Sequence, residues 1–304
     1  MRRSPQISVV VGAYNAQRYV EQMLRGILDQ TFTDFELLVV DDGSTDRTLK
    51  ILRGYEKQDS RMRVIAKPHS GIVDAANLGL QEAQCELIAR ADADDIALPD
   101  RFEKQIRYMH QHPECHALGA QMLLVDPQGS PLMETRLPLE HDGIEKEMLA
   151  GSGWAMPQPV VMLRRTPALA CGGYRKQYEW AEDLDLFLRM AENGRLANLP
   201  DVLVKYRIHM ASTNHTKYAH QIAIKRSLVA EAFRRRGKEM PDDWSFTPRK
   251  IVPPAQQYRH WTYKALRHQN VAAARRHALA ALRHAPLDKQ SWIATLHAFR
   301  GRCR

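Results

Sequence analysis

The chain has 304 residues, which is enough for one large domain or two modest ones. Its 44% hydrophobic and 26% charged residues are ordinary for a globular protein and exclude a disordered, collagen-like or coiled-coil chain. The net charge of +9 suggests a polyanionic partner, such as nucleic acid or an anionic membrane. However, residues 234–304 hold 16 Lys and Arg against 4 Asp and Glu, so residues 1–233 carry a net charge of −3.

The first hundred residues alternate short apolar runs with segments whose apolar residues recur at helical spacing. This alternation predicts strands joined by helical crossovers, and therefore an α/β fold with a Rossmann-like, mostly parallel sheet flanked by helices. Ligands bind beyond the carboxyl ends of the strands in such sheets. The predicted strands are 7–11, 35–40, 64–66 and 87–89, and the predicted helices lie at about 19–28, 49–52 and 74–83.

Helix starts are predicted from capping residues. Asp100 is expected to cap the helix that follows it, with Glu103 completing a capping box. If residues 41–46 are only a helix entry, Ser44 or Thr45 would cap the helix near residue 49; the alternative is that this segment holds a nucleoside. Further along the chain, the pattern predicts strands at 117–125 and 160–163, a turn at 126–129 and a helix at 182–191.

The composition changes beyond about Pro241. Alternating Ala, Leu, Arg and His predict a basic amphipathic helix at 272–284, and apolar residues around Trp261 predict a partner helix before it. Its basic face is either a solvated surface or a contact with anionic lipid headgroups. We therefore expect a catalytic domain at 1–233, with halves at about 1–125 and 126–233, and a basic helical extension at 234–304.

The cysteines and the apolar runs bear on where the chain resides. The four cysteines are far apart without a Cys-x-x-Cys pair, which predicts ordinary reduced thiols. The apolar run after Arg2 and Arg3 is too short for a signal peptide. No run approaches the roughly 18 to 20 apolar residues that a membrane span needs. We therefore expect a cytoplasmic protein.

Two acidic clusters follow predicted strands at the same edge of the sheet. Asp41 and Asp42 come after the second strand, and Asp92, Asp94 and Asp95 come after the fourth. An isolated acidic pair is more often a helix cap or a solvated turn, but two clusters at one edge favour a ligand. Closely spaced carboxylates suit Mg²⁺ or Mn²⁺, and the first pair also suits hydrogen bonds to a nucleoside.

A third acidic group, at residues 182–185, opens a predicted helix. Acids in a first helical turn are stabilised by the helix dipole, and this explanation competes with a general base that acts on a hydroxyl group. After the first strand stands Gly12-Ala13-Tyr14-Asn15, where a dinucleotide-binding fold needs G-x-G-x-x-G, and no Walker A loop is present. A dehydrogenase or a P-loop enzyme therefore fits poorly.

Taken in order, these segments resemble the inverting nucleotide-sugar glycosyltransferases of family 2. The resemblance extends over about residues 5–215 and implies an A-type glycosyltransferase fold, a nucleotide-diphosphate-sugar donor and a divalent metal, Mn²⁺ or Mg²⁺. The matching segments are Ile7–Asn15, Asp41–Thr48, Gly71 with Ala75–Gly79, Arg90–Asp95, Pro157–Arg165 with Gly172–Tyr174, Glu182–Leu186 and Tyr206–His209.

The resemblance also implies roles for individual residues. Ala76 departs from the family pattern, because many members have an arginine there, so a diphosphate contact is either missing or supplied by Arg90 or Lys67. The implied nucleotide-sugar-binding residues are Gly12, Tyr14, Asp41, Asp42, Arg90 and Asp92, the implied metal ligands are Asp94, Asp92 and His209, and the implied catalytic base is Asp183.

The implied function is inverting transfer of a sugar to a hydroxyl acceptor in cell-envelope polysaccharide synthesis, the acceptor being a saccharide or a lipid-linked saccharide. The expected location is cytoplasmic, with peripheral contact between residues 234–304 and an anionic membrane. Two alternatives stay open. A sugar nucleotidyltransferase also uses a parallel sheet, acids and a metal, although its usual basic, glycine-rich loop is missing here. A nucleic-acid-binding protein fits the basic tail, but no recognition motif supports it.

Overall fold

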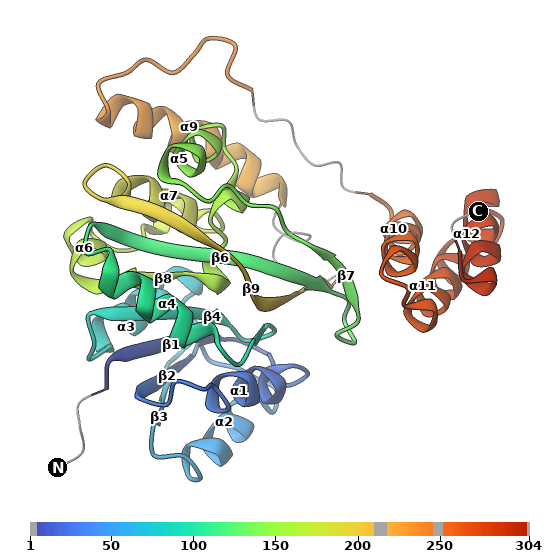
Figure 1. The fold of residues 1–304 in the computed structure, drawn as a ribbon, viewed down its shortest axis with the longest axis horizontal. Coiled ribbons are helices and arrows are strands. Elements are labelled where there is room, and N and C mark those ends of the chain that lie inside the picture. The colour runs from blue at the N-terminus through green and yellow to red at the C-terminus, as the bar shows by residue number, and fades with distance from the viewer. Residues whose placement is uncertain (1–4, 210–217, 246–251, 303–304) are drawn as a thin grey trace. The chain divides into compact units, whose positions relative to one another are not determined.

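The computed structural model describes residues 5–209, 218–245 and 252–302. It divides into two compact units, each assembled from separate stretches of the chain (Figure 1). The first unit comprises Met1–Met122, Arg136–Val204 and Ala219–Phe246, and the second unit comprises Leu123–Thr135, Lys205–Tyr218 and Thr247–Arg304.

A mixed sheet with the strand order β3-β2-β1-β4-β8-β6-β9-β5 organises the first unit. The strands β3, β2, β1 and β4 pair in parallel, as predicted, whereas β8 pairs antiparallel with both β4 and β6. The expected helix-flanked α/β fold is therefore confirmed, with the parallel pairs in its first half. The strands are β1 Ile7–Ala13, β2 Phe35–Asp41, β3 Met62–Ala66, β4 Leu87–Asp92, β5 Ile96–Ala97, β6 Cys115–Val125, β7 Pro131–Glu134, β8 Met162–Arg164 and β9 Arg195–Arg207.

Helices cover both faces of this sheet, which explains why the central strands are continuously apolar. In β1, Val9 and Val11 pack into a core with α1 and α4, while Val10 packs into the opposite core with α3 and α7. The helices of the first unit are α1 Val20–Leu28, α2 Thr48–Glu56, α3 Ile72–Glu82, α4 Arg101–Gln111, α5 His141–Leu149, α6 Arg165–Ala170, α7 Glu182–Met190 and α9 Tyr218–Arg235.

Both predicted helices form, but the predicted side-chain caps are not seen. Asp100 is the N-cap residue of α4, as predicted, although its side chain makes no cap hydrogen bond. At α2, neither Ser44 nor Thr45 caps the helix. Instead, Asp46 Oδ1 accepts a hydrogen bond from Thr48 N at 2.8 Å. The hydroxyl of Ser44 is engaged elsewhere, in the contact between two loops that is described below.

The position between residues 233 and 234, where the sequence suggested a boundary, falls inside α9. Arg235 Nε lies 2.8 Å from Glu192 Oε1, and Arg236 Nη2 lies 2.9 Å from Glu145 Oε1. These two arginines are ion-paired within the first unit, so they do not belong to a free basic surface.

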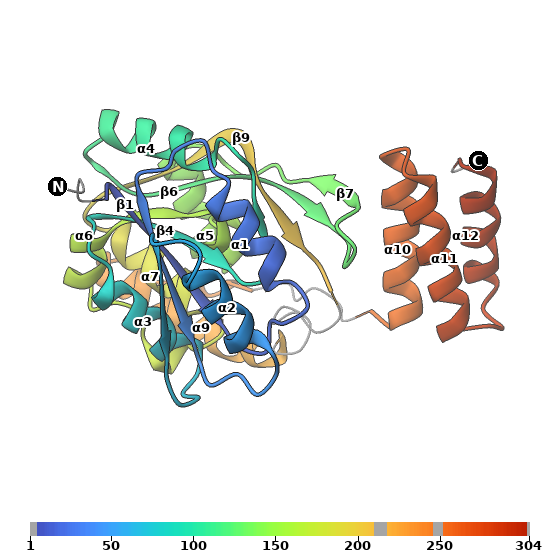
Figure 2. The same cartoon turned by 90° about the horizontal axis from the view of Figure 1, so that it is seen from below.

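The second unit contains β7 and three helices that lie side by side, α10 Pro254–Arg267, α11 Val271–His284 and α12 Lys289–Arg300 (Figure 2). The two helices expected from the sequence are present, and α12 is an additional one. Asp288 caps α12 by accepting hydrogen bonds from Ser291 N at 3.0 Å and Gln290 N at 3.3 Å. Gly301, with φ of 69°, follows its last turn.

Asp126 joins the β6–β7 turn to α11. Its fully buried carboxylate lies 2.9 Å from His277 Nε2 and 2.9 Å from Arg276 Nη2. Its Oδ1 atom accepts hydrogen bonds from the backbone N–H groups of Gln128 at 2.9 Å and Ser130 at 2.7 Å. Because a buried carboxylate without partners is strongly unfavourable, the turn and the helices of this unit depend on one another.

The described cysteines Cys85, Cys115 and Cys171 are free thiols, as expected. Within the described part of the chain, every helix is too short or too polar to cross a membrane.

Candidate functional site

The carboxyl ends of β1, β2 and β4 bring the first two acidic clusters to one place. In the sheet register, Ala13 of β1 pairs with Asp41 of β2, and Gly12 pairs with Asp92 of β4. The end of β1 therefore lies between two acidic strand ends, as the strand pattern predicts. Gly12 has no atom within 4 Å of the position where a Cβ would lie, which leaves open space beside the strand.

The loop after β1 is fastened to the loop after β2. Asn15, with φ of 50°, accepts a hydrogen bond from Thr45 N at 2.8 Å, and its own N–H donates to Ser44 Oγ at 3.0 Å. Asp41 Oδ2 accepts from Ser44 N at 3.1 Å. The other carboxylate oxygen of Asp41 is buried and has no hydrogen-bond partner among the described residues, so it can accept a bond from a ligand.

Asp42 organises the loop that follows β3. Its Oδ1 accepts from Ser70 N at 3.0 Å and its Oδ2 accepts from Gly71 N at 3.0 Å, while Lys67 Nζ also donates to it. Burial raises the pKa of Asp42, but these hydrogen bonds outweigh it and hold the pKa below its usual value. The carboxylate is thus ionised and shapes the backbone around the site.

His69 is a site residue that the sequence interpretation missed. Its Nδ1 lies 2.8 Å from Asp42 Oδ2, and its ring stacks on Tyr14 with 4.3 Å between the ring centroids. Tyr14 is half exposed, so the stacked pair offers an aromatic surface at the same edge of the sheet. A histidine in the loop after a third parallel strand was the available signal, because that loop opens at the same edge.

The Asp92 cluster is the strongest candidate for a metal site. One carboxylate oxygen from each of Asp92, Asp94 and Asp95 lies within 4.8 Å of the others. Burial, followed by repulsion from Asp94, raises the pKa of Asp92 to about 7. Oxygen donors packed this closely suit a hard divalent cation, whose charge would relieve the repulsion. The residues present therefore fit Mg²⁺ or Mn²⁺.

Two buried arginines lie beneath this cluster. Arg90 is in β4 and donates to the carbonyl of Val10 at 3.1 Å, and its guanidinium carbon lies 6.0 Å from the ring centroid of Tyr174. Arg101 donates to the carbonyl of Arg90 at 2.6 Å. Burial lowers the pKa of Arg101 to about 9, against the influence of Asp95 and Asp92. The structure places Arg90 inside the fold, two residues before Asp92 on the same strand.

The acids that open α7 have different surroundings. Asp185 is buried and bonded to Arg189, with 2.5 Å between Nη2 and Oδ2, and to Arg175. Asp183, by contrast, is half-buried and accepts a hydrogen bond from the N–H of Leu184 at 2.7 Å. Asp185 therefore stabilises the fold, and Asp183 is the more exposed acid of the two.

Asp183 lies close enough to the Asp92 cluster to interact with it electrostatically, since its charge contributes to the raised pKa of Asp92. Burial also raises the pKa of Asp183 itself, an effect that Leu184 N–H and the ammonium of Lys225 in α9 oppose. Burial and the charge of Asp183 raise the pKa of the neighbouring Glu182 to about 8. Lys225 was not identified from the sequence, because only the folded chain brings α9 to α7.

Asn77 links two motifs that are nearly one hundred residues apart. Its Nδ2 donates to the carbonyl of Tyr174 at 2.8 Å, and its Oδ1 accepts from Tyr174 N at 2.8 Å. Gly173 precedes this contact, and a Cβ there would lie 2.6 Å from Asn77 Oδ1. Ala76, where the family pattern has arginine, is buried in the core beside it.

His209 lies two residues beyond the end of β9 and belongs to the second unit, whereas the other predicted site residues belong to the first. Its role as a metal ligand stays a prediction.

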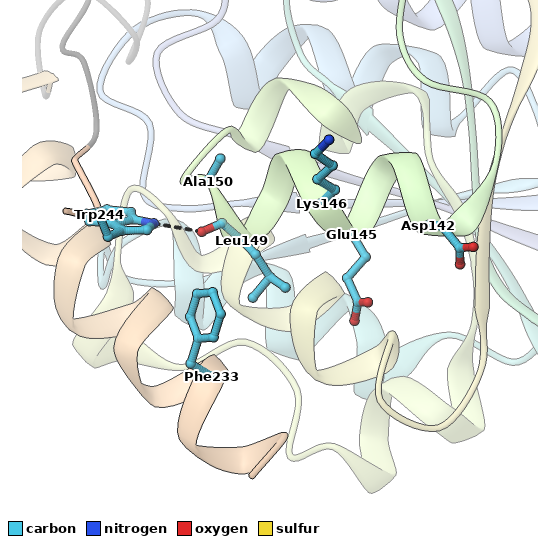
Figure 3. A pocket seen from close by; sticks show the side chains of 7 residues that line it. All are labelled: Asp142, Glu145, Lys146, Leu149, Ala150, Phe233 and Trp244. Carbon is cyan, nitrogen blue, oxygen red and sulfur yellow. Dashed lines mark hydrogen bonds between the residues drawn. The ribbon is translucent and has the colours of Figure 1, made fainter. Parts of the chain in front are cut away.

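A pocket of about 400 Å³ lies between α5 and the chain around α9 (Figure 3). Two of its polar side chains have partners within the chain. Trp244 Nε1 donates to the carbonyl of Leu149 at 2.8 Å, and Glu145 is paired with Arg236. The lining residues are Asp142, Glu145, Lys146, Leu149, Ala150, Phe233 and Trp244, none of which is a predicted site residue.

The chain matches the family model described as "Glycosyl transferase family 2" over residues 8–129. It is 31% identical to an uncharacterized glycosyltransferase of Haemophilus influenzae, an alignment that covers 73% of this chain and 71% of that protein. It is also 34% identical to the amylovoran biosynthesis glycosyltransferase AmsE of Erwinia amylovora, covering 66% and 75% of the two chains. The O-antigen biosynthesis glycosyltransferase WbnJ of Escherichia coli is 31% identical and is covered over 84% of its length by 70% of this chain.

Two solved structures share the fold at 18% identity. TarS of S. aureus, in complex with UDP-GlcNAc, gives a TM-score of 0.60 over 98% of this chain and 92% of that chain. The mannosyltransferase PcManGT of Pyrobaculum calidifontis, in complex with GDP-Man and Mn²⁺, gives 0.55 over 97% and 80%. Of the functions that the sequence leaves open, these comparisons support glycosyl transfer. The chain belongs to glycosyltransferase family 2, has relatives that work in cell-envelope polysaccharide synthesis, and is a glycosyltransferase.

Proposed function

We propose that this enzyme transfers a sugar, with inversion, from a nucleotide-diphosphate donor to a hydroxyl group in a metal-dependent reaction. The observation that carries the proposal is the position of Asp183, whose charge acts on Asp92 of the acidic cluster. A single site would then combine an acidic cluster suited to a cation with a partly exposed carboxylate. This is the combination that in-line displacement at an anomeric carbon requires.

The donor nucleoside would bind where β1 and β2 end. The unpartnered oxygen of Asp41 can accept a hydrogen bond from a base or ribose, and the half-exposed ring of Tyr14 can contact the base. Asp42 would act beside them by fixing the loop that carries His69. The two neighbouring structures are complexes with UDP-GlcNAc and with GDP-Man, which supports a nucleotide-sugar donor here.

Asp94 and Asp92 would hold the divalent metal, with His209 as a further ligand. A bound Mn²⁺ or Mg²⁺ would supply positive charge against the diphosphate. Asp92 would contact either the metal or the ribose, and Arg90 would support the strand end from below or contact the diphosphate.

Asp183 would be the general base. It would take the proton of the acceptor hydroxyl while that oxygen forms a bond to the anomeric carbon, and the bond between this carbon and the diphosphate oxygen would break. The nucleoside diphosphate then leaves, and the configuration at the anomeric carbon is inverted. Lys225 would lower the proton affinity of Asp183 before the reaction, because its positive charge favours the ionised carboxylate.

The acceptor we propose is a saccharide or a lipid-linked saccharide in cell-envelope polysaccharide synthesis. The names of AmsE and WbnJ, which refer to amylovoran and O-antigen biosynthesis, support this class. We further propose that the basic helical region at 247–304 works at the cytoplasmic face of an anionic membrane. The twelve Lys and Arg against one acidic residue in 247–304 support that contact.

A thermal-shift screen of UDP-, GDP- and dTDP-sugars, with and without Mn²⁺, tests the donor and the metal together. We expect one nucleotide family to raise the melting temperature, and Mn²⁺ to enlarge the shift. Incubation with the stabilising donor should then release nucleoside diphosphate. Release of pyrophosphate from sugar phosphate and nucleoside triphosphate would instead indicate a nucleotidyltransferase and refute the proposal.

A further inference from the structure

The outward face of α12 is apolar although it faces water. Trp292, Leu296 and Phe299 are spaced four and three residues apart, which places them on one side of the helix. Their exposed fractions are 58%, 48% and 52%. The opposite side of the helix, with Ser291, Ala294 and Ala298, is buried against the rest of the second unit.

The loop before α12 extends this face. Leu287 is 97% exposed, and the indole N–H of Trp292 donates to the carbonyl of Pro286 at 2.8 Å. That hydrogen bond satisfies the polar atom of Trp292 and leaves its ring among exposed apolar atoms. We call Leu287, Trp292, Leu296 and Phe299 the apolar ridge. Exposed apolar patches of this kind usually mark a contact with another molecule or a membrane.

Positive charges surround the ridge. Lys289 and Arg300 lie on the same helix and are both exposed. From α11, the guanidinium carbon of Arg275 lies 5.1 Å from the ring centroid of Phe299, and Arg275 also donates to the carbonyl of Phe299 at 3.2 Å. The single acid in 247–304, Asp288, is paired with Arg259. The ridge therefore lies on a surface with almost no negative charge.

This combination distinguishes between occupants. A second copy of the chain would bring two positively charged surfaces together, and the repulsion would oppose association. Nucleic acid would pair with the cations but would leave Leu287 and Leu296 in contact with water. A bilayer with anionic headgroups offers phosphates to the cations and an apolar layer to the ridge.

We propose that the apolar ridge inserts into the interfacial layer of an anionic lipid membrane, while Lys289, Arg300 and Arg275 bind the headgroups. Trp292 and Phe299 would sit at headgroup depth, where aromatic rings are favoured. This proposal names the residues that make the membrane contact included in the proposed function. It rests on the proposed function only for the claim that the enzyme works at a membrane. Lipid binding itself requires neither donor nor acceptor.

The test uses the full chain and vesicles of phosphatidylcholine with and without phosphatidylglycerol. We expect co-sedimentation with the anionic vesicles and a blue shift of Trp292 emission. Trp292→Phe should remove the blue shift while vesicle binding persists. A triple variant, Trp292→Ser with Leu296→Ser and Phe299→Ser, should partition at least about tenfold more weakly, because the insertion of apolar side chains drives this kind of binding.

A matched control replaces exposed apolar residues of the first unit, Leu139→Ser with Leu169→Ser, and should sediment like the parent chain. Circular dichroism of each variant should match the parent, since all the substituted side chains are exposed. Donor-induced thermal shifts of the triple variant should also equal those of the parent. If the parent chain itself shows no donor-induced thermal shift, the proposed donor is refuted, while the lipid-binding result is unaffected.

Three outcomes would overturn the inference. The first is sedimentation that is equal with neutral and anionic vesicles or absent with both. The second is binding of the triple variant as tight as that of the parent, which would mean that charge alone holds the chain on the membrane. The third is a concentration-dependent dimer that the triple variant abolishes, with no vesicle binding by the parent, which would assign the ridge to a second copy.

Discussion

The side-chain amide of Asn77 brackets the backbone of Tyr174, because it donates to the carbonyl and accepts from the N–H of the same residue at 2.8 Å each. One side chain of α3 thereby fixes the start of the segment that leads to α7 and Asp183.

Asn77→Ala should destabilise the protein by about 1 to 3 kcal/mol, since it leaves the partly buried N–H and carbonyl of Tyr174 without their partners. Urea unfolding measures the effect. The control Asn193→Ala removes an exposed side chain and should change the free energy of unfolding by less than about 0.5 kcal/mol. Equal stability of the two variants would show that water replaces both hydrogen bonds of Asn77 without loss in the free energy of unfolding.

Gly79 and Gly54 form a second matched pair, because both lie inside helices but have different surroundings. A Cβ on Gly79 would lie 2.3 Å from Val10 Cγ1, whereas Gly54 has open space. We expect Gly79→Ala to cost about 1 to 3 kcal/mol through overpacking against β1. Gly54→Ala should stabilise by up to about 1 kcal/mol through helix propensity. Melting temperatures that move in the same direction would contradict the packing between α3 and β1.

The sequence predicts much of this arrangement, and the limits have physical causes. Asp41 and Asp92 could be placed at one edge, because parallel strands deliver their carboxyl ends together. The spacing along α7 could not reveal that Asp185, rather than Asp183, forms ion pairs with Arg175 and Arg189. Those partners depend on tertiary packing.

Site neighbours that come from distant parts of the chain could not be predicted either. Lys225 arrives from α9, and His69 comes from a loop whose shape depends on Asp42. The side-chain cap of α2 also failed as a prediction, because the hydroxyl of Ser44 accepts from Asn15 N of another loop, while Asp46 Oδ1 accepts from Thr48 N.

Asp183→Asn should reduce glycosyl transfer by about 10²- to 10⁴-fold, because an amide cannot take the proton from the hydroxyl group of the acceptor. Donor binding should persist, since Asp183 contributes to the acceptor side of the reaction. The measurements are nucleoside diphosphate release with acceptor present and the donor-induced thermal shift. Turnover within a few fold of the parent enzyme would remove Asp183 from the mechanism.

Asp94→Ala should weaken Mn²⁺ binding by more than the roughly 10- to 100-fold that follows loss of an outer-shell partner. Isothermal titration of Mn²⁺ in the presence of donor gives the affinity directly. Glu82→Gln is a suitable control, because it changes an exposed carboxylate that pairs with Arg63 at the surface. If Asp94→Ala and Glu82→Gln bind Mn²⁺ alike, the acidic cluster is not the metal site.

Acid stability should report on Asp126. Burial raises the pKa of Asp126, but the hydrogen bond from His277 and those from the turn outweigh it and lower the pKa to about 2. A carboxyl whose pKa is lowered on folding stabilises above its unfolded pKa of about 4, and this contribution of about 2 kcal/mol is lost as pH falls toward 2.

Asp126→Asn should therefore be less stable than the parent at pH 7 and approach it near pH 2. Fluorescence of the buried Trp261, whose ring centroid lies 5.4 Å from that of His277, follows the second unit. A stability difference that does not change between pH 5 and pH 2 would contradict the lowered pKa.

The carboxylate of Asp126 also determines whether the C-terminal helices can be removed or replaced. It lies in a turn between two strands, while its partners Arg276 and His277 lie about 150 positions later in the chain. Ending the chain before α10 would remove both side chains that pair with this carboxylate and would leave it only the N–H groups of the turn. The C-terminal helices of this chain are therefore not an independent module, because replacing them removes the partners of Asp126 unless the β6–β7 turn changes with them.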